Sequence, residues 1–167
     1  KKYFISTYGC QANERDSETL AGILDELGFA PNETAEGSDV IIINTCAIRQ
    51  NAEEKVLGEI GNFKRLYREN KDLVIGVCGC MAQEEGLVET LLTKYPQVRL
   101  LFGTHNIQEL PSMLYSCMVE GKKVVKIYSK EGEVYENLPV HRFGTFKAWV
   151  NIMYGCDKFC TYCIVPY

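Results

Sequence analysis

The sequence reads Val40-Ile41-Ile42-Ile43-Asn44-Thr45-Cys46, four branched apolar residues followed by two polar residues and a cysteine. A strand that is apolar at every position is suited to burial on both faces, which is typical of parallel sheets with helices on each side. This stretch therefore predicts a central parallel strand of an α/β fold.

Similar apolar, β-rich runs recur on both sides of this strand, and the segments between them have helical periodicity. The five runs are residues 3–5, 40–43, 73–77, 98–102 and 124–128. The helical positions are Leu20, Ile23, Leu24 and Leu27; Val56, Ile60, Phe63 and Tyr67; Leu87, Val88, Leu91 and Tyr95; and Ile107, Leu110, Leu114 and Cys117. This alternation predicts a doubly wound, mostly parallel sheet of about five strands with helices on both faces.

Residue types also indicate where elements and domains end. Asn13 is a candidate cap for the first helix, and Gly28 is a candidate stop. The helical pattern ends near residue 129, and a further strand is predicted over 146–153. We expect an α/β domain, a linker and the truncated start of a second domain, over residues 1–130, 131–144 and 145–167.

The composition excludes several classes of protein. The 167 residues are 46% hydrophobic and 24% charged, which argues against a disordered, collagenous or coiled-coil chain. With 18 basic and 22 acidic side chains, the formal charge of −4 gives no overall basic field for a nucleic acid. The longest apolar stretch, residues 73–82, is shorter than the roughly 18 residues of a membrane span. Residues 1–7 lack an apolar signal region, so we expect a cytoplasmic protein without a membrane partner.

The most specific local signal is the group Cys156, Cys160 and Cys163, in which three and then two residues separate the thiols. Three soft ligands on one short loop can hold a metal. A tetrahedral zinc site needs a fourth ligand, and neither His105 nor His141 stands at a zinc-finger spacing. An iron–sulfur cluster can use three thiolates and leave one iron open to the amino and carboxylate groups of S-adenosylmethionine. The spacing favours an iron–sulfur loop over zinc or unligated thiols.

A second group of cysteines is scattered in the sequence, since Cys10, Cys46 and Cys80 each follow an apolar run and precede a predicted helix. The carboxyl ends of neighbouring parallel strands line one crevice, so these residues can converge on a single site. A metal site, a redox-active thiol and plain packing all remain open. Cys78 competes with Cys80 for the third position, although Cys78 lies inside its apolar run.

Other residues are weaker candidates for a role at the carboxyl ends of these strands. Gly9 and Gly79 allow the tight turns and close approach that a bulky cluster requires. Further candidates are Gln11, Asn44 and Thr45 as hydrogen-bond donors to cluster sulfurs, His105 as a rim residue, and Lys64, Arg65, Arg68 and Lys71 as a phosphate contact.

The loop at 156–163, with Tyr162 before its last cysteine, resembles the signature loop of radical S-adenosylmethionine enzymes. The motifs YGCQAN at 8–13, NTCAIR at 44–49 and GCMAQ at 79–83 resemble the amino-terminal domain of the methylthiotransferase family. Residues 149–167 are most similar to the branch of that family that acts on bacterial tRNA. The resemblance covers essentially the whole chain.

This resemblance implies a function and a role for six cysteines. The bacterial tRNA branch adds a methylthio group to carbon 2 of N6-dimethylallyladenosine beside the anticodon, whereas sister branches modify threonylcarbamoyl-adenosine in tRNA or a ribosomal-protein aspartate. The loop cysteines would bind a 4Fe-4S cluster whose open iron holds S-adenosylmethionine for cleavage to a deoxyadenosyl radical. The strand-end cysteines, with Cys80 rather than Cys78 as the third ligand, would hold a second 4Fe-4S cluster that supplies the sulfur. The two sets are Cys156, Cys160 and Cys163, and Cys10, Cys46 and Cys80.

The resemblance also implies partners. These are a tRNA substrate and an electron donor such as flavodoxin or ferredoxin. In the family a partial barrel and an RNA-binding domain follow the loop, so we expect this chain to be inactive alone and the strand at 146–153 to pair with the domain edge or another copy. The alternative of another class is an iron–sulfur electron-transfer or redox-sensing module.

Overall fold

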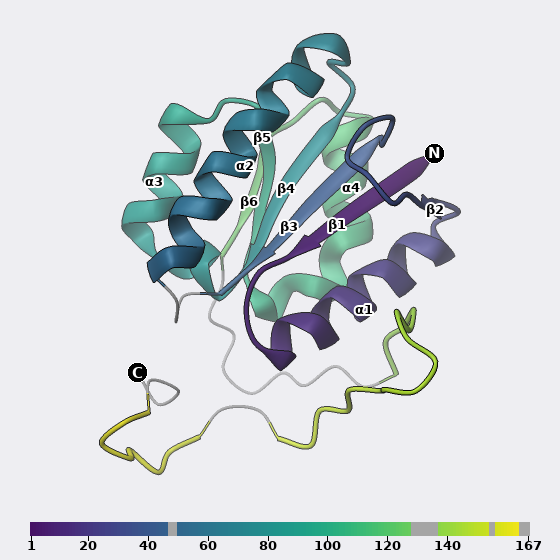
Figure 1. Cartoon of the computed structure of the whole chain (residues 1–167). Helices are drawn as coiled ribbons and strands as arrows, with labels where there is room; N and C mark the ends of the chain where they lie inside the picture. Colours follow the sequence, from purple (N-terminus) through teal and green to yellow (C-terminus); the bar gives the residue numbers. More distant parts are fainter. Residues whose placement is uncertain (47–49, 128–136, 154–155, 164–167) are drawn as a thin grey trace.

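Parallel strands form one sheet in the order β2-β1-β3-β4-β5-β6 (Figure 1). The structure is a computed structural model that describes residues 1–46, 50–127, 137–153 and 156–163. Its strands are β1 (Lys2–Thr7), β2 (Ala30–Pro31), β3 (Val40–Thr45), β4 (Val74–Gly79), β5 (Val98–Phe102) and β6 (Val124–Lys126). The predicted parallel α/β sheet is confirmed, with one strand more than the expected five in the described residues. The additional strand, β2, is only two residues long, and its pairing with Lys2 and Tyr3 defines it rather than any apolar pattern.

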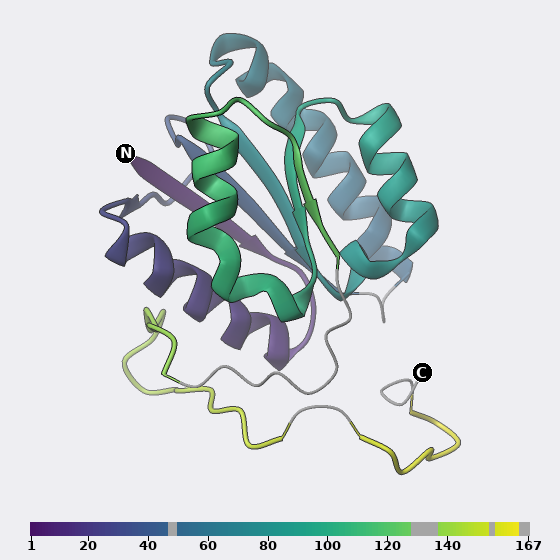
Figure 2. The ribbon, with the colours of Figure 1, turned by 180° about the vertical axis from the view of Figure 1, so that it is seen from behind.

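Helices cover both faces of the sheet, as Figures 1 and 2 show from opposite sides. Within the described residues, α1 and α4 pack on one face, and α2 and α3 pack on the other. The helices are α1 (Gln11–Glu26), α2 (Gln50–Glu69), η1 (Cys80–Gln83), α3 (Glu85–Lys94), η2 (Thr104–Glu109) and α4 (Leu110–Met118). No helix in these ranges has the length and apolar character that a membrane crossing requires.

The central strand β3 explains why both faces need helices. Val40 and Ile42 pack toward α1 and α4, whereas Ile41 and Ile43 pack toward α2 and α3. All four side chains are fully buried. Burial of each one stabilises the fold by about 1.5–3 kcal/mol, which commits the strand to the middle of the sheet.

The first helix begins earlier than the sequence indicates. Its N-cap is Cys10, and Asn13 is instead the third helical residue. The Asn13 carboxamide oxygen accepts a hydrogen bond from the Cys10 backbone N–H at 3.1 Å, so Asn13 satisfies the helix start from inside the first turn. The prediction of Asn13 as the cap is wrong because the chain turns into the helix directly after Gly9.

Gly28 ends the same helix, as predicted. Its φ of 80° lies in the left-handed region, and its N–H donates to Asp25 O at 2.9 Å. The N–H of Phe29 donates to Leu24 O at 3.0 Å, which completes a Schellman motif.

The predicted strand at 146–153 is not formed. This segment has no regular secondary structure, and Phe146 and Ile152 are fully exposed. A strand needs a neighbour that completes its hydrogen-bond ladder, and instead Lys147 and Trp149 of this segment bind Glu14 of α1. The expectation that this segment pairs with the edge of the sheet is therefore wrong, and its pairing with another copy stays a prediction.

We expect Gly28→Ala to lower the free energy of unfolding by about 1–2 kcal/mol, because an L side chain is strained at a left-handed φ. Gly61→Ala is the matched control, since a Cβ at this exposed position of α2 meets nothing within 4 Å. That substitution should leave stability unchanged or raise it. Urea unfolding followed by circular dichroism measures both, and equal midpoints for the two variants would contradict the role of Gly28.

Candidate functional site

Three cysteines lie at the carboxyl ends of three neighbouring strands. Cys10 follows β1, Cys46 follows β3 and Cys80 follows β4. β3 pairs with both of the other strands, and the pairing of Thr45 with Gly79 places Cys46 and Cys80 at equivalent positions. We call Cys10, Cys46 and Cys80 the strand-end cysteines, and the edge that carries them the carboxyl edge.

The three thiols have different environments but act on one another. Cys10 is exposed, Cys80 is half-buried and Cys46 is buried. Burial raises the pKa of the Cys80 thiol, and the neighbouring Cys46 and Cys10 thiols raise it further. The thiolate form of Cys80 is thus disfavoured in this structure, and a nearby cation would favour it.

Two other cysteines belong to the core. Cys78 lies within β4 and packs against the apolar cluster under α1 and α4, and burial raises its pKa well above the usual range. Cys117 of α4 is fully buried in the same cluster. Both positions agree with their sequence interpretation as packing residues.

Glycines bring the turns of the carboxyl edge into contact. A Cβ at Gly9 would lie 2.6 Å from Cys46 Cβ, and a Cβ at Gly79 would lie 2.1 Å from Thr45 O. The φ values of these glycines are 149° and 97°, which L side chains rarely adopt. The close approach expected from the sequence is present, and it is made to the neighbouring turns.

Asn13 and Asn44 form a buried network beneath these turns. The Asn13 side-chain amide donates to Thr45 O at 2.9 Å and to Asn44 Oδ1 at 3.1 Å, while its oxygen accepts from the Cys10 N–H. Asn44 Nδ2 donates in return to Asn13 O at 2.9 Å and to Ser17 Oγ at 3.0 Å. Asn13 therefore ties the turn that carries Cys10 to the turn that carries Cys46.

Thr45 extends the network to the third turn, because its hydroxyl donates to Cys78 O at 2.7 Å. The side-chain donors of Thr45 and Asn44 bind the protein's own groups in this structure, and their role as donors to cluster sulfurs stays a prediction. Gln11, the third predicted donor, is exposed. Sequence reasoning missed Asn13 as the connecting residue, although an asparagine three positions after Cys10 is the available signal.

The second cysteine group lies in the C-terminal segment. Cys156 and Cys160 are exposed and Cys163 is half-buried. The N–H of Cys163 donates to Cys160 O at 3.0 Å, which closes a turn, and Phe159 has a left-handed φ of 47°. Among the residues that the structure describes, no three His, Cys, Asp or Glu side chains are grouped so as to hold a metal ion. Both three-cysteine metal sites stay predictions.

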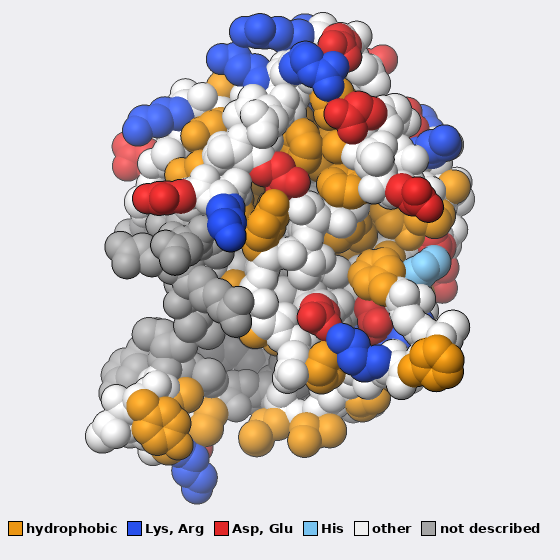
Figure 3. Space-filling view, in the orientation of Figure 1, with side chains coloured by type: hydrophobic (Ala, Val, Ile, Leu, Met, Phe, Trp, Pro, Cys, Tyr) orange, Lys and Arg blue, Asp and Glu red, His pale blue; other side chains and the backbone are white. Residues whose placement is uncertain are grey.

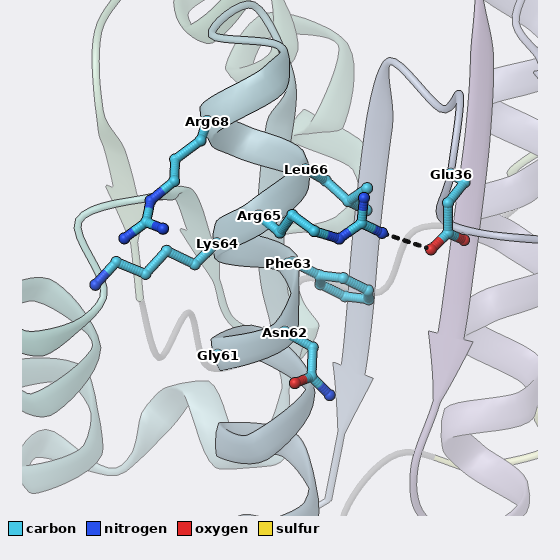
Figure 4. Close-up of a pocket in the computed structure, with 8 residues that line it drawn as sticks. All are labelled: Glu36, Gly61, Asn62, Phe63, Lys64, Arg65, Leu66 and Arg68. Atoms are coloured by element: carbon cyan, nitrogen blue, oxygen red, sulfur yellow. Dashed lines mark hydrogen bonds and ion pairs between the residues drawn. The ribbon is translucent and has the colours of Figure 1, made fainter.

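The remaining candidates lie outside the three turns that carry the strand-end cysteines. His105 is exposed on η2, which follows β5 at the same carboxyl edge, in agreement with its prediction as a rim residue. Lys64, Arg65 and Arg68 line an open pocket of about 490 Å³ near the C-terminal end of α2, and Arg65 pairs with Glu36 at 3.3 Å (Figure 4). Basic side chains gather there at the upper rim, whereas the carboxyl edge lies at the lower side (Figures 1 and 3). The predicted phosphate contact is therefore not part of the strand-end site.

A family model matches the part of the chain that contains the strand-end cysteines. The model of the uncharacterized protein family UPF0004 matches residues 2–103, a range that contains all three strand-end cysteines. Proteins named tRNA-2-methylthio-N(6)-dimethylallyladenosine synthase are similar along all 167 residues: those of Bacillus pumilus strain SAFR-032 and Bacillus licheniformis are 58% identical, and that of Bacillus cytotoxicus is 59% identical. The matches cover 100% of this chain and 33% of each relative, so the chain spans about a third of their length.

We expect Asn13→Ala to lower the free energy of unfolding by about 1–3 kcal/mol, because it removes the buried donor of the hydrogen bonds that Asn44 Oδ1 and Thr45 O accept. Asn62→Ala, at an exposed position of α2, is the matched control and should change stability by less than about 0.5 kcal/mol. Chemical unfolding measures both variants. If the Asn13 variant were as stable as the control, the network would not hold the edge together.

Proposed function

The chain belongs to the family described as uncharacterized protein family UPF0004, and from this membership we propose that it is part of a tRNA methylthiotransferase. The modified atom is carbon 2 of N6-dimethylallyladenosine, and the product carries a methylthio group there. The observation that carries the proposal is 58–59% identity along the whole chain to relatives named for this reaction. These names favour this substrate over threonylcarbamoyl-adenosine or a ribosomal-protein aspartate.

The donor set at the carboxyl edge fits an iron–sulfur cluster. Thiolates are the ligands that such clusters use, and three cysteines stand at the ends of neighbouring strands.

We assign Cys10, Cys46 and Cys80 to one 4Fe-4S cluster and the loop cysteines to a second cluster that binds S-adenosylmethionine. When bound, the clusters would supply reductive cleavage of S-adenosylmethionine and the sulfur that replaces the hydrogen at carbon 2, with the methyl group taken from a second S-adenosylmethionine. The loop cysteines are Cys156, Cys160 and Cys163. An external reductant of the flavodoxin or ferredoxin type would provide the electron.

The chain's own residues position the strand-end cysteines for this role. Cys10 is the N-cap residue of α1. The half-burial of Cys80 and the burial of Cys46 limit access of water on one side, whereas Cys10 is exposed on the other. Asn13 and Thr45 hold in register the turns that carry these thiols.

Iron and sulfide analysis after anaerobic reconstitution tests the cluster assignment. The chain should hold about four irons more than a variant with Cys10, Cys46 and Cys80 all replaced by alanine. Cys78→Ala is the matched control, because this neighbour of Cys80 is packed in the core, and it should keep the full iron content. Equal iron content in the chain and in the triple variant would contradict the assignment of a strand-end cluster. It would favour a redox or structural role for this domain.

The reaction itself is tested in the whole protein that contains this chain. Cells that carry only Cys10→Ala in that protein should lose the methylthio group and retain N6-dimethylallyladenosine, as measured by mass spectrometry of tRNA nucleosides. The Cys78→Ala protein should retain the modification. Methylthiolation at the normal level in the Cys10 variant would contradict the proposed function.

A further inference from the structure

The segment over residues 137–149, here called the strap, lies along α1 in both ribbon views (Figures 1 and 2). The strap passes close to Gly22, in the interior of the helix. A Cβ at Gly22 would lie 2.5 Å from the carbonyl carbon of Pro139 and 2.6 Å from the nitrogen of Val140. Glycine is unfavourable inside a helix relative to alanine, and here the absence of a side chain leaves room for the strap.

Polar groups of α1 hold the strap next to this glycine. The His141 N–H donates to Glu18 O at 2.9 Å, and His141 Nδ1 lies 2.5 Å from Asp25 Oδ2. The Arg142 guanidinium pairs with the carboxylate of Glu18, whose side chain is only 5% exposed. A buried carboxylate that loses its cation is costly, so α1 depends on the strap at this point.

The far end of the strap is fixed at the first turn of α1. One carboxylate oxygen of Glu14 accepts hydrogen bonds from Lys147 Nζ at 2.9 Å and from Trp149 Nε1 at 2.6 Å. The N–H of Glu14 donates to Cys10 O at 3.2 Å, so Glu14 stands one helical turn after a strand-end cysteine. The strap thus connects the edge that carries Cys10 to the chain that leads into the Cys156 loop.

We propose that Glu14, Glu18 and Gly22 form an intramolecular docking seat on α1, and that Glu14 is a positioning residue that keeps the Cys156 loop near the strand-end cysteines. This inference rests on the proposed function, in which the two cysteine groups serve one reaction. In this inference the surface of α1, and not the cysteines themselves, keeps the two cysteine groups close together.

The number of residues between an anchor and Cys156 determines how strongly docking of the strap restricts the Cys156 loop. Cys156 follows Trp149 by seven residues, so a docked strap holds it within about 25 Å of that anchor. Without docking, the nearest fixed point is Lys126 at the end of β6, thirty residues away, which allows about 100 Å. Effective concentration falls roughly as the −3/2 power of tether length, so docking raises that of the loop about ninefold.

The fluorescence of Trp149 tests the seat directly, because it is the only tryptophan of the chain. Glu14→Ala should shift its emission to longer wavelength and increase its quenching by acrylamide. Glu26→Ala, at an exposed position at the other end of α1, is the matched control and should change neither signal. Gly22→Ala separates docking from helix formation, since it favours the helix yet places a Cβ inside the strap; it should also release Trp149 while the far-UV circular dichroism of the chain is retained.

Cross-linking measures the positioning. A bismaleimide should join the exposed Cys10 and Cys156 in a chain with Cys160 and Cys163 replaced by serine. Because Glu14→Ala leaves the Arg142–Glu18 contact in place, the free tether to Cys156 lengthens from seven to fourteen residues, and this reaction should slow about threefold. Unchanged emission and cross-linking in both Glu14→Ala and Gly22→Ala would overturn the docking seat. Neither readout uses iron, S-adenosylmethionine or tRNA, so that result would leave the proposed function standing. If the triple cysteine variant held as much iron as the unaltered chain, that result would contradict the proposed function. It would leave the Trp149 signal, and with it the docking seat, unaffected.

Discussion

The parallel pairing of β1, β3 and β4 is the constraint on which the rest of the molecule depends. Parallel strands must all be entered from the same edge, so each connection leaves at the carboxyl edge and returns along a helix. The turns after these strands are therefore crowded together. Gly9 and Gly79 are required there because any Cβ would collide with the adjacent turn. The same crowding brings three thiols that are far apart in sequence to one edge.

Crowded turns contain backbone groups that water cannot reach, and the amide network satisfies them. Asn13 and Asn44 are each both donor and acceptor, so two side chains serve the turns after β1 and β3 at once. A satisfied buried network is also rigid, since any displaced member leaves an unpaired polar group behind.

The strap depends on a different balance of interactions. Its contacts to Glu14 lie at the surface, where solvent screens an ion pair. The contact to Glu18 involves a buried carboxylate, and the contact at Gly22 is a close fit between backbones. The middle of the strap is thus held more firmly than its end.

Local sequence patterns predict five of the six strands in the described residues, the helices between them and the places of the cysteines at strand ends. Apolar runs and helical periods indicate burial within a few residues, and Gly28 indicates a local backbone conformation. The hydrogen-bond partners of distant segments follow from the tertiary fold instead. β2 exists only because it pairs with β1, residues 146–153 form no strand because no segment of the described ranges forms a ladder with them, and the donors of Asn44 bind residues of α1. The physical reason is that a hydrogen bond between distant segments depends on where the fold brings them together, and no local pattern records that position.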